Sequence, residues 1–243
     1  MKPGDLDITS DWIALILNLI GDWRAPPFRH TYGKTDISSL ARIVEFTVAY
    51  NNPMHPAIFL DRDGVIIENR SEYVRDWSHV NMLPGALDAL SGFHSLGFKT
   101  VIVTNQSAIG RGLMTFETAQ LINDRLVKTI KENGGWVDGV FMCPHKPEDN
   151  CPCRKPHPGL LLQAAHELSL DLPSSWMVGD AWTDLAAGQS AGVEGAILVR
   201  TGRGSSQLLK THSEELQPFL ICDDILDAFN NITFLRKTKP TET

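Results

Sequence analysis

Two carboxylates, two residues apart, are the first feature of the sequence that could do chemistry. Asp61 and Asp63 follow the short apolar run AIFL at 57–60, which is typical of a buried strand. With a strand period, both carboxylates would face the same way and Arg62 would face the other, while Gly64 would let the chain turn away. Close carboxylates repel each other, so we expect a cation or a proton between them.

Further polar residues end two other strand-like runs. Thr104 and Asn105 end KTVIVTN, and Asp180 ends SSWMVGD. Carboxylates of this kind suit Mg²⁺, which takes one or two of them together with waters and a substrate phosphate. Lys155, in CRKP, could neutralise a transferring phosphoryl group. Each motif alone is more typical of a turn or a cap, but together they favour phosphoryl transfer through an aspartyl-phosphate.

A cysteine–histidine cluster is the second chemical feature. Cys143, His145, Cys151 and Cys153 fall within eleven residues and offer three thiolates and one imidazole. This Cys₃His set is typical of a closed, structural Zn²⁺ site. A reactive cysteine and unliganded cysteines remain alternatives, and Cys222 stands apart as a small buried hydrophobe.

Strand-like and helix-like segments alternate from residue 57 onward, which predicts an α/β fold. Such alternation gives a Rossmann-like, three-layer sandwich with a central parallel sheet, and ligands bind outside the carboxyl ends of its strands. The expected strands are 57–61, 99–105, 137–144, 174–180 and 195–202, the expected helices are 85–98, 115–135, 157–170 and 183–192, and a late strand and helix follow within 221–232.

Residues 1–55 differ from this pattern and are predicted to form an N-terminal helical extension, before a phosphatase-like domain at 56–235. DITSDWIALILNLIGDW and TDISSLARIVEFTVAY have capping residues followed by apolar residues at helical spacing. The extension would pack on the main domain or on a second copy, or would bind a partner. A non-catalytic, partner-binding protein that uses 1–55 is therefore a second class of function.

Composition excludes several classes of partner. The chain has 243 residues, 42% of them hydrophobic, and a formal net charge of −7, so we expect no nucleic-acid partner. The longest apolar run, WIALILNLI at 12–20, is shorter than a membrane span and lacks the features of a signal peptide. We therefore expect a cytoplasmic protein without a membrane partner; its oligomeric state stays open.

The motifs resemble those of the haloacid dehalogenase superfamily of phosphatases over about residues 57–202. FLDRDGV is similar to its first motif, VIVTNQS to its second, the lysine of CRKP to its third and MVGDAWTD to its fourth. The resemblance implies that Asp61 attacks phosphorus and that Asp63 is the general acid and base. Further roles that it implies are phosphoryl binding by Thr104 and Lys155, Mg²⁺ binding by Asp61, the Asp63 backbone carbonyl and Asp180, and support of the metal site by Asp184.

The zinc loop resembles the branch that contains the D-glycero-D-manno-heptose 1,7-bisphosphate phosphatases and the histidinol-phosphate phosphatases, which have a minimal cap. TNQSAIGRG and CRKPHPGLLL are similar to the heptose enzymes, which implies removal of the C7 phosphate in cell-surface glycan synthesis. Histidinol phosphate or another small sugar phosphate remains the alternative substrate.

Four residues are predicted to bind the phosphorylated sugar: Asn105, Ser107, Arg111 and Arg154. The two arginines could grip a second phosphate, because guanidinium groups bind phosphate through paired hydrogen bonds. The segment RTGRG at 200–204 is expected to be a plain turn rather than a phosphate-binding loop.

Overall fold

A six-stranded parallel sheet forms the centre of the computed structural model, which describes residues 53–210 and 216–238. The strand order is β3-β2-β1-β4-β5-β6. The extension predicted for 1–55 lies almost wholly outside the described residues. The strands are β1 (His55–Leu60), β2 (Lys99–Asn105), β3 (Gly139–Cys143), β4 (Leu170–Gly179), β5 (Gly195–Val199) and β6 (Leu220–Cys222).

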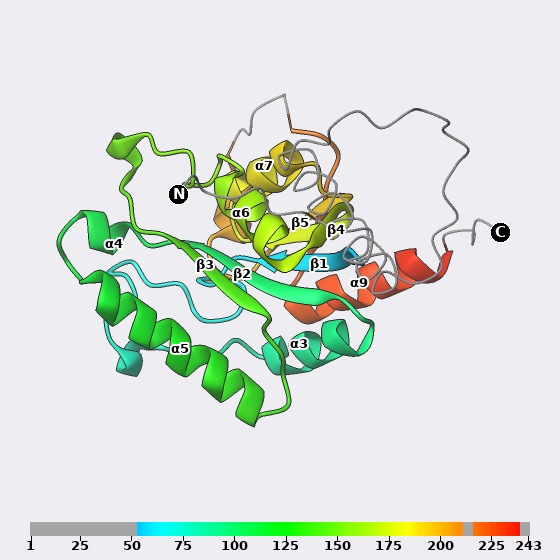
Figure 1. Cartoon of the computed structure of the whole chain (residues 1–243), viewed down its shortest axis with the longest axis horizontal. Coiled ribbons are helices and arrows are strands. Elements are labelled where there is room, and N and C mark those ends of the chain that lie inside the picture. Colours follow the sequence, from blue (N-terminus) through cyan, green and yellow to red (C-terminus); the bar gives the residue numbers. More distant parts are fainter. Residues whose placement is uncertain (1–52, 211–215, 239–243) are drawn as a thin grey trace, which may run out of the picture. The chain divides into compact units, whose positions relative to one another are not determined.

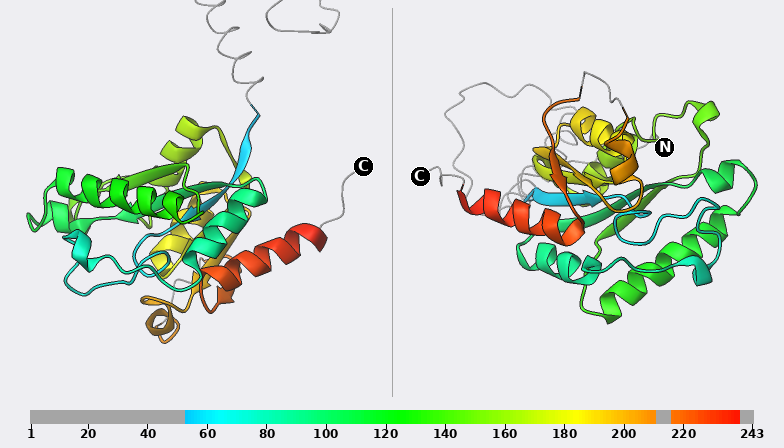
Figure 2. Two further views of the ribbon diagram at one scale, coloured as in Figure 1. Left: turned by 90° about the horizontal axis from the view of Figure 1, so that it is seen from below. Right: turned by 180° about the vertical axis from the view of Figure 1, so that it is seen from behind.

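Helices cover both faces of this sheet, so the predicted three-layer α/β sandwich is confirmed (Figure 1). α3 (Ala86–Ser95), α5 (Phe116–Glu132) and α9 (Ile225–Thr238) lie on one face, and α6 (Gly159–Leu168) and α7 (Trp182–Ala191) lie on the other. Figure 2 shows the same layers from two other directions. The helices α4 (Ser107–Gly110) and α8 (Gly204–Gln207) are single turns that follow β2 and β5.

The central strand β1 explains why this sequence needs helices on both sides. Ile58 and Leu60 belong to the apolar core under α3, α5 and α9, whereas Ala57 and Phe59 belong to the core under α6 and α7. All four side chains are fully buried. Successive side chains on a strand point to opposite faces, so a continuous apolar run can be satisfied only between two covering layers.

The predicted elements are all present, but several of their boundaries differ from the expected ones, most clearly around residue 170. Thr115 caps α5 as expected, with its hydroxyl accepting a hydrogen bond from the Thr118 backbone N–H at 3.1 Å. The helix predicted to reach 170 ends at Leu168, because Ser169 adopts a left-handed conformation with φ +52°. β4 consequently begins at Leu170, earlier than predicted, and pairs there with His55.

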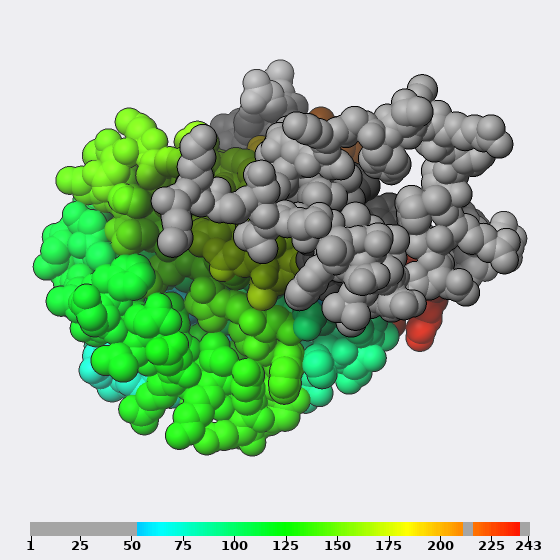
Figure 3. All heavy atoms as spheres, in the orientation of Figure 1, coloured from blue at the N-terminus to red at the C-terminus, as the bar shows by residue number. Residues whose placement is uncertain are grey.

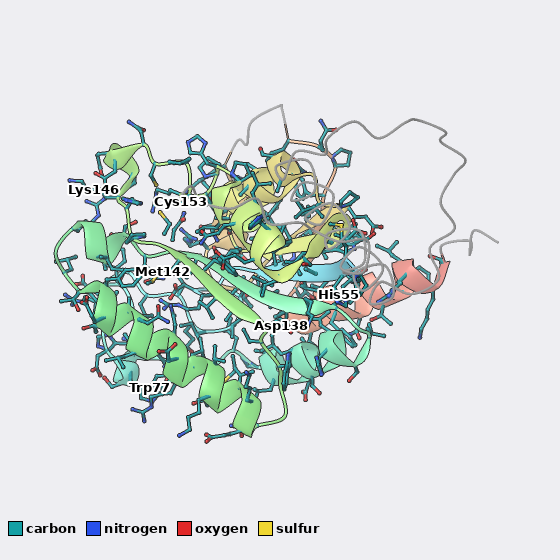
Figure 4. The ribbon with its side chains drawn as sticks, viewed as in Figure 1. His55, Trp77, Asp138, Met142, Lys146 and Cys153 are labelled. Carbon is teal, nitrogen blue, oxygen red and sulfur yellow. The ribbon has the colours of Figure 1, made fainter. Side chains whose placement is uncertain are left out.

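Two loops rise from the carboxyl end of the sheet, where the site is expected. The first, 61–85, contains the 3₁₀ turn Trp77–His79, and the second, 144–158, contains the 3₁₀ turn Pro147–Asp149. Neither loop contains an α-helix, in agreement with a minimal cap. In Figure 4, Cys153 and Lys146 lie at this end, and His55 and Asp138 lie toward the other. No helix in the described ranges combines the length and apolarity that crossing a bilayer requires.

Candidate active site

Lys155 joins two carboxylates that come from different elements: Asp61 directly follows β1, and Asp184 lies in the first turn of α7. Its Nζ lies 2.8 Å from Asp61 Oδ1 and 2.8 Å from Asp184 Oδ1, and it donates to the Val103 carbonyl at 2.7 Å. The lysine side chain is 1% exposed. Burial opposes its charge, but Asp184 and Asp61 outweigh that effect and raise the pKa of Lys155 above its ordinary value. The lysine is therefore a fixed positive charge beside Asp61.

Asp180 is fully buried at the end of β4 and is held by Arg203. The Arg203 guanidinium lies 2.7 Å from Asp180 Oδ1, and its backbone N–H donates to Oδ2 at 2.8 Å. Burial raises the pKa of Asp180 to about 6, although the hydrogen bond from Arg203 works against that rise. The backbone comes this close because Gly64 and Gly202 have no side chains; a Cβ at either position would lie within 2.3 Å of Asp180 Oδ2.

Asp61, Asp180 and Asp184 form a group that fits a divalent cation. One oxygen from each lies within 4.8 Å of the others, and all three residues are buried. Burial also raises the pKa of Asp184. Three carboxylates with two nearby cationic side chains, Lys155 and Arg203, still leave one uncompensated negative charge. Hard oxygen ligands of this kind match Mg²⁺.

The expectation that Arg62 points away from the acidic pair is wrong, because its guanidinium binds Asp63. The buried Arg62 guanidinium donates to Asp63 Oδ2 at 2.9 Å and to the α5 residue Asn123 at 2.8 Å. Gln106 donates to Asp63 Oδ2 and to the Thr104 hydroxyl, each at 2.9 Å. An arginine side chain is long enough to turn back toward its neighbour, so Asp63 is neutralised by Arg62 rather than by a cation shared with Asp61.

A cavity of about 100 Å³ lies above these residues. Asp61, Asp63, Lys155 and Asp184 line it, whereas the buried Thr104 and Asp180 do not. The remaining lining residues are Asn69, Arg70, Tyr73, Val74, Asn105, Gln106, Thr183 and Arg203. The structure thus places both carboxylates of the first motif and the lysine of the third around one space.

Of the four residues predicted to bind substrate, only Asn105 lines the cavity. Its side chain also exchanges two hydrogen bonds with the backbone of Lys155, at 3.1 and 3.2 Å, and so orients the lysine. Arg154 donates to the Ser107 hydroxyl at 2.8 Å, and Arg111 lies 3.7 Å from Glu148. In this structure, these contacts of Ser107, Arg111 and Arg154 link the segment that follows β2 to the 144–158 loop.

The cysteine–histidine cluster comes together as a possible metal site. One ligand atom from each of the four residues lies within 4.8 Å of the others. The sulfur–sulfur distances are 3.3 to 3.5 Å, near the roughly 3.8 Å that tetrahedral Zn–S bonds imply. Burial raises the pKa of the Cys143 and Cys153 thiols, a cost that a bound cation would remove.

This cluster borders the segment that follows β2. The Gly110 backbone N–H donates to the Pro144 carbonyl at 2.9 Å. Figure 3 shows the yellow-green loop atoms beside the green atoms of that segment. Lys155 follows Cys153 by two positions, so the cluster is directly connected to the cavity.

Two parts of the cavity wall were not predicted from the sequence. Arg203 lies in the segment expected to be a plain turn, yet its guanidinium binds Asp180. Asn69, Arg70 and Tyr73 come from the loop after β1, which no motif indicated. The available signal was position, because both segments follow the carboxyl ends of strands.

Comparisons with known proteins agree with this geometry. A protein-family model described as HAD-hydrolase-like matches residues 152–228. A D-glycero-beta-D-manno-heptose-1,7-bisphosphate 7-phosphatase from Yersinia pestis is 39% identical over 155 residues, which are 61% of this chain and 82% of that relative. A protein of the same name from Pseudomonas putida is 36% identical over 168 residues, 69% of this chain and 94% of that relative.

A solved structure shows the same similarity in three dimensions. It is the D,D-heptose 1,7-bisphosphate phosphatase from B. bronchiseptica, complexed with magnesium and phosphate. Its TM-score with this chain is 0.68 at 34% sequence identity, and the match covers 75% of this chain and 99% of that one. The similarity therefore spans nearly all of that protein.

Proposed function

We propose that this chain is a Mg²⁺-dependent phosphatase that removes the C7 phosphate from D-glycero-D-manno-heptose 1,7-bisphosphate. The chain belongs to the family of the D-glycero-beta-D-manno-heptose-1,7-bisphosphate 7-phosphatases, among the haloacid dehalogenase-like hydrolases. The observation that carries the proposal is the buried contact of Lys155 with Asp61 and Asp184 at the floor of the cavity. It fixes a nucleophilic carboxylate, a phosphate-binding cation and metal-binding carboxylates together.

Asp61 is the nucleophile in this mechanism. Lys155 holds Asp61 Oδ1, so Oδ2, which lies 4.0 Å from the Arg203 guanidinium, would be the oxygen that attacks phosphorus. Attack forms an aspartyl-phosphate and breaks the bond from phosphorus to the C7 oxygen of the sugar, and Asp63 gives that leaving oxygen a proton. A water molecule then attacks the same phosphorus, Asp63 takes its proton, and orthophosphate leaves. Lys155 binds the phosphoryl oxygens. The same role for the Thr104 hydroxyl would require a phosphate that reaches below the cavity wall, because Thr104 is fully buried and does not line the cavity.

Asp61, Asp180 and the Asp63 backbone carbonyl would hold Mg²⁺, and Asp184 would support the metal site. When bound, Mg²⁺ supplies positive charge that brings the anionic phosphate and the carboxylate nucleophile together. Arg203 already supplies part of that charge at Asp180, through a guanidinium contact of 2.7 Å.

The four-residue cluster would hold a structural Zn²⁺ that keeps the 143–155 loop ordered. Its three cysteines are unpaired, and none of the four described cysteines forms a disulfide. Unpaired thiols are typical of a reducing compartment, so we propose that the enzyme acts in the cytoplasm, on a small phosphorylated sugar.

Orthophosphate release is the direct test of this function. The wild-type protein with Mg²⁺ is expected to hydrolyse heptose 1,7-bisphosphate at C7, assayed as each anomer, faster than it hydrolyses histidinol phosphate. Asp61→Asn should remain folded, as judged by circular dichroism, and lose at least about a thousandfold in kcat because the amide is a poor nucleophile.

Three results would contradict the proposal or part of it. Faster turnover of histidinol phosphate would reassign the substrate. Retained activity in Asp61→Asn would refute the nucleophile, whereas absence of activity in the wild type on every phosphate ester would favour the partner-binding class.

A further inference from the structure

The carboxylate of Asp63 is held by a buried arginine that uses most of its donors on one oxygen. Arg62, whose side chain is 1% exposed, donates to Asp63 Oδ2 from Nε at 3.1 Å and from Nη2 at 2.9 Å. Gln106 donates to the same Oδ2 at 2.9 Å, whereas Oδ1 accepts only from Arg62 Nη2, at 3.2 Å. Oδ1 is therefore the oxygen of Asp63 that has room to exchange a proton in the cavity.

An asparagine in α5 fixes the other end of the Arg62 guanidinium. Arg62 Nη1 donates to Asn123 Oδ1 at 2.8 Å, which is the one hydrogen bond that Nη1 makes within the described ranges. Asn123 is 1% exposed and lies 61 positions away in the chain. A buried cation cannot turn to water when it loses a partner, so this amide decides where the guanidinium lies.

The amide of Asn123 is itself oriented by β3. Its Nδ2 lies 3.7 Å from the sulfur of Met142, which packs against the core on the α5 side of the sheet. The nitrogen of the amide thus faces a weak acceptor, and its oxygen is left for Arg62. Asn123 consequently presents an acceptor to the guanidinium.

The polar side chain of Asn123 is unusual for its place in the helix. It is the one polar residue among the five that α5 buries, together with Ala119, Ile122, Leu126 and Ile130. A buried amide is unfavourable unless its hydrogen bonds are made, and an apolar residue would suit this face better. Asn123 does not line the cavity, so any effect on the chemistry passes through Arg62.

We propose that Asn123 is a positioning residue that acts on the reaction through Arg62 and Asp63. By fixing the guanidinium, it keeps Asp63 Oδ1 where it can give a proton to the leaving oxygen as the bond to phosphorus breaks, and then take a proton from the attacking water. This inference rests on the proposed function. It places a determinant of turnover in α5, outside the cavity.

The leaving group of the substrate separates positioning from support of the fold. A sugar alkoxide needs a proton from Asp63 as it leaves, whereas nitrophenolate leaves without one. We therefore compare kcat/KM for heptose 1,7-bisphosphate and for p-nitrophenyl phosphate. Asn123→Leu should lower the first by roughly 10- to 100-fold, because a catalytic group displaced by about 1 Å loses about that much, and the second by less than about threefold.

Pre-steady-state kinetics with the nitrophenyl ester gives a second readout. Breakdown of the aspartyl-phosphate still requires Asp63 to take a proton from water. Asn123→Leu should therefore release about one equivalent of nitrophenolate per chain in a rapid burst before a slower steady state, with a larger burst than the wild type. A variant that is only less stable would show no such increase.

Three further variants complete the comparison. Asn123→Asp keeps an oxygen acceptor of the same length for Arg62 and should recover part of the loss. Asn123→Ala supplies the same test without added bulk if Asn123→Leu does not fold, as judged by circular dichroism. Asn231→Leu is the matched control, since Asn231 is a half-buried amide in α9 that donates to Asp227 and does not line the cavity. It should leave the ratio of the two kcat/KM values unchanged.

Two outcomes for Asn123→Leu would overturn the assignment. Equal losses on both esters would mean that Asn123 only supports the fold, and unchanged values on both would mean that it has no role. If the wild type hydrolyses histidinol phosphate rather than the bisphosphate, that alkyl ester takes its place in the comparison and the same outcomes apply.

Asp63→Asn separates this inference from the proposed function. It should show the same selective loss on the alkyl ester, at least as large as that of Asn123→Leu. If it does not, the acid role of Asp63 in the proposed function is refuted, and positioning by Asn123 with it. If Asp63→Asn shows the selective loss and Asn123→Leu does not, the Asn123 assignment alone is overturned.

Discussion

At the scale of single residues, Lys155 is a buried charge whose partners are themselves buried charges. Asp61 and Asp184 both contact it at 2.8 Å, and neither side chain is more than 6% exposed. Breaking a buried ion pair by removing one partner is costly because the other charge stays in a low-dielectric environment. A residue proposed to act on phosphate therefore also contributes to stability.

Replacing Lys155 by Met should test both contributions. We expect no measurable orthophosphate release and, in metal-free protein, a free energy of unfolding lower by about 3–5 kcal/mol in urea titrations. Adding Asp184→Asn should restore part of the stability but no activity. Lys99→Met, which removes a half-exposed partner of Asp138, should cost about 1 kcal/mol or less. Equal urea midpoints for Lys155→Met and wild type would contradict this account.

At the scale of elements, the 143–155 loop connects the cysteine–histidine cluster to the cavity. Cys153 and Lys155 are separated by one residue, and the Lys155 backbone is tied to Asn105 at the end of β2. Pro147, Pro152 and the 3₁₀ turn restrict the loop locally, but its few buried side chains provide little core of their own. The position of Lys155 should therefore depend on what the cluster binds.

Cys151→Ser should separate zinc from the rest of the fold. The wild type should carry about one equivalent of zinc per chain after dialysis, measured by elemental analysis, because four ligands complete a tetrahedral site. The variant should lose that zinc and most of its phosphatase activity while keeping its far-UV circular dichroism.

Cys222→Ala provides the control, because Cys222 is a buried thiol outside the loop, with a pKa that burial raises to about 12. It should retain zinc and activity. Full zinc content in Cys151→Ser, or none in the wild type, would contradict the assignment of the cluster.

At the scale of the whole molecule, the site exists because parallel strands end at one edge. Asp61 follows β1, Asp180 follows β4 and Arg203 follows β5, and these strands are adjacent in the sheet. The sheet holds the carboxylates together although they repel each other. A cation that binds there would stabilise the folded state and not the unfolded chain.

Mg²⁺ should therefore raise the midpoint of thermal unfolding. At a hundred times the dissociation constant, the gain is about 2.7 kcal/mol, which corresponds to roughly 5–10 °C for a domain of this size. Differential scanning fluorimetry of protein with zinc retained measures the shift. Asp180→Asn, which removes one carboxylate, should lose most of it. An unchanged midpoint at Mg²⁺ concentrations that support full activity would count against the three-carboxylate site.

Much of the site could be predicted because its signals are local. An apolar run followed by Asp61, or by Thr104, predicts a buried strand with a polar end, and parallel strands bring such ends to one edge. The Cys₃His spacing likewise predicts a cluster, since the residues are close in the chain. Fold class, strand order along the chain and the composition of the cavity floor follow from these patterns.

The sequence by itself therefore determined the layers, the strand ends and the chemical types gathered there. Only the tertiary structure decided which charge meets which: Arg62 with Asp63, and Arg203 with Asp180. Local patterns depend on neighbouring side chains, which the sequence displays directly. Pairing across 23 or 94 positions depends on how the whole core packs, and flexible arginine and lysine side chains can then reach several alternatives.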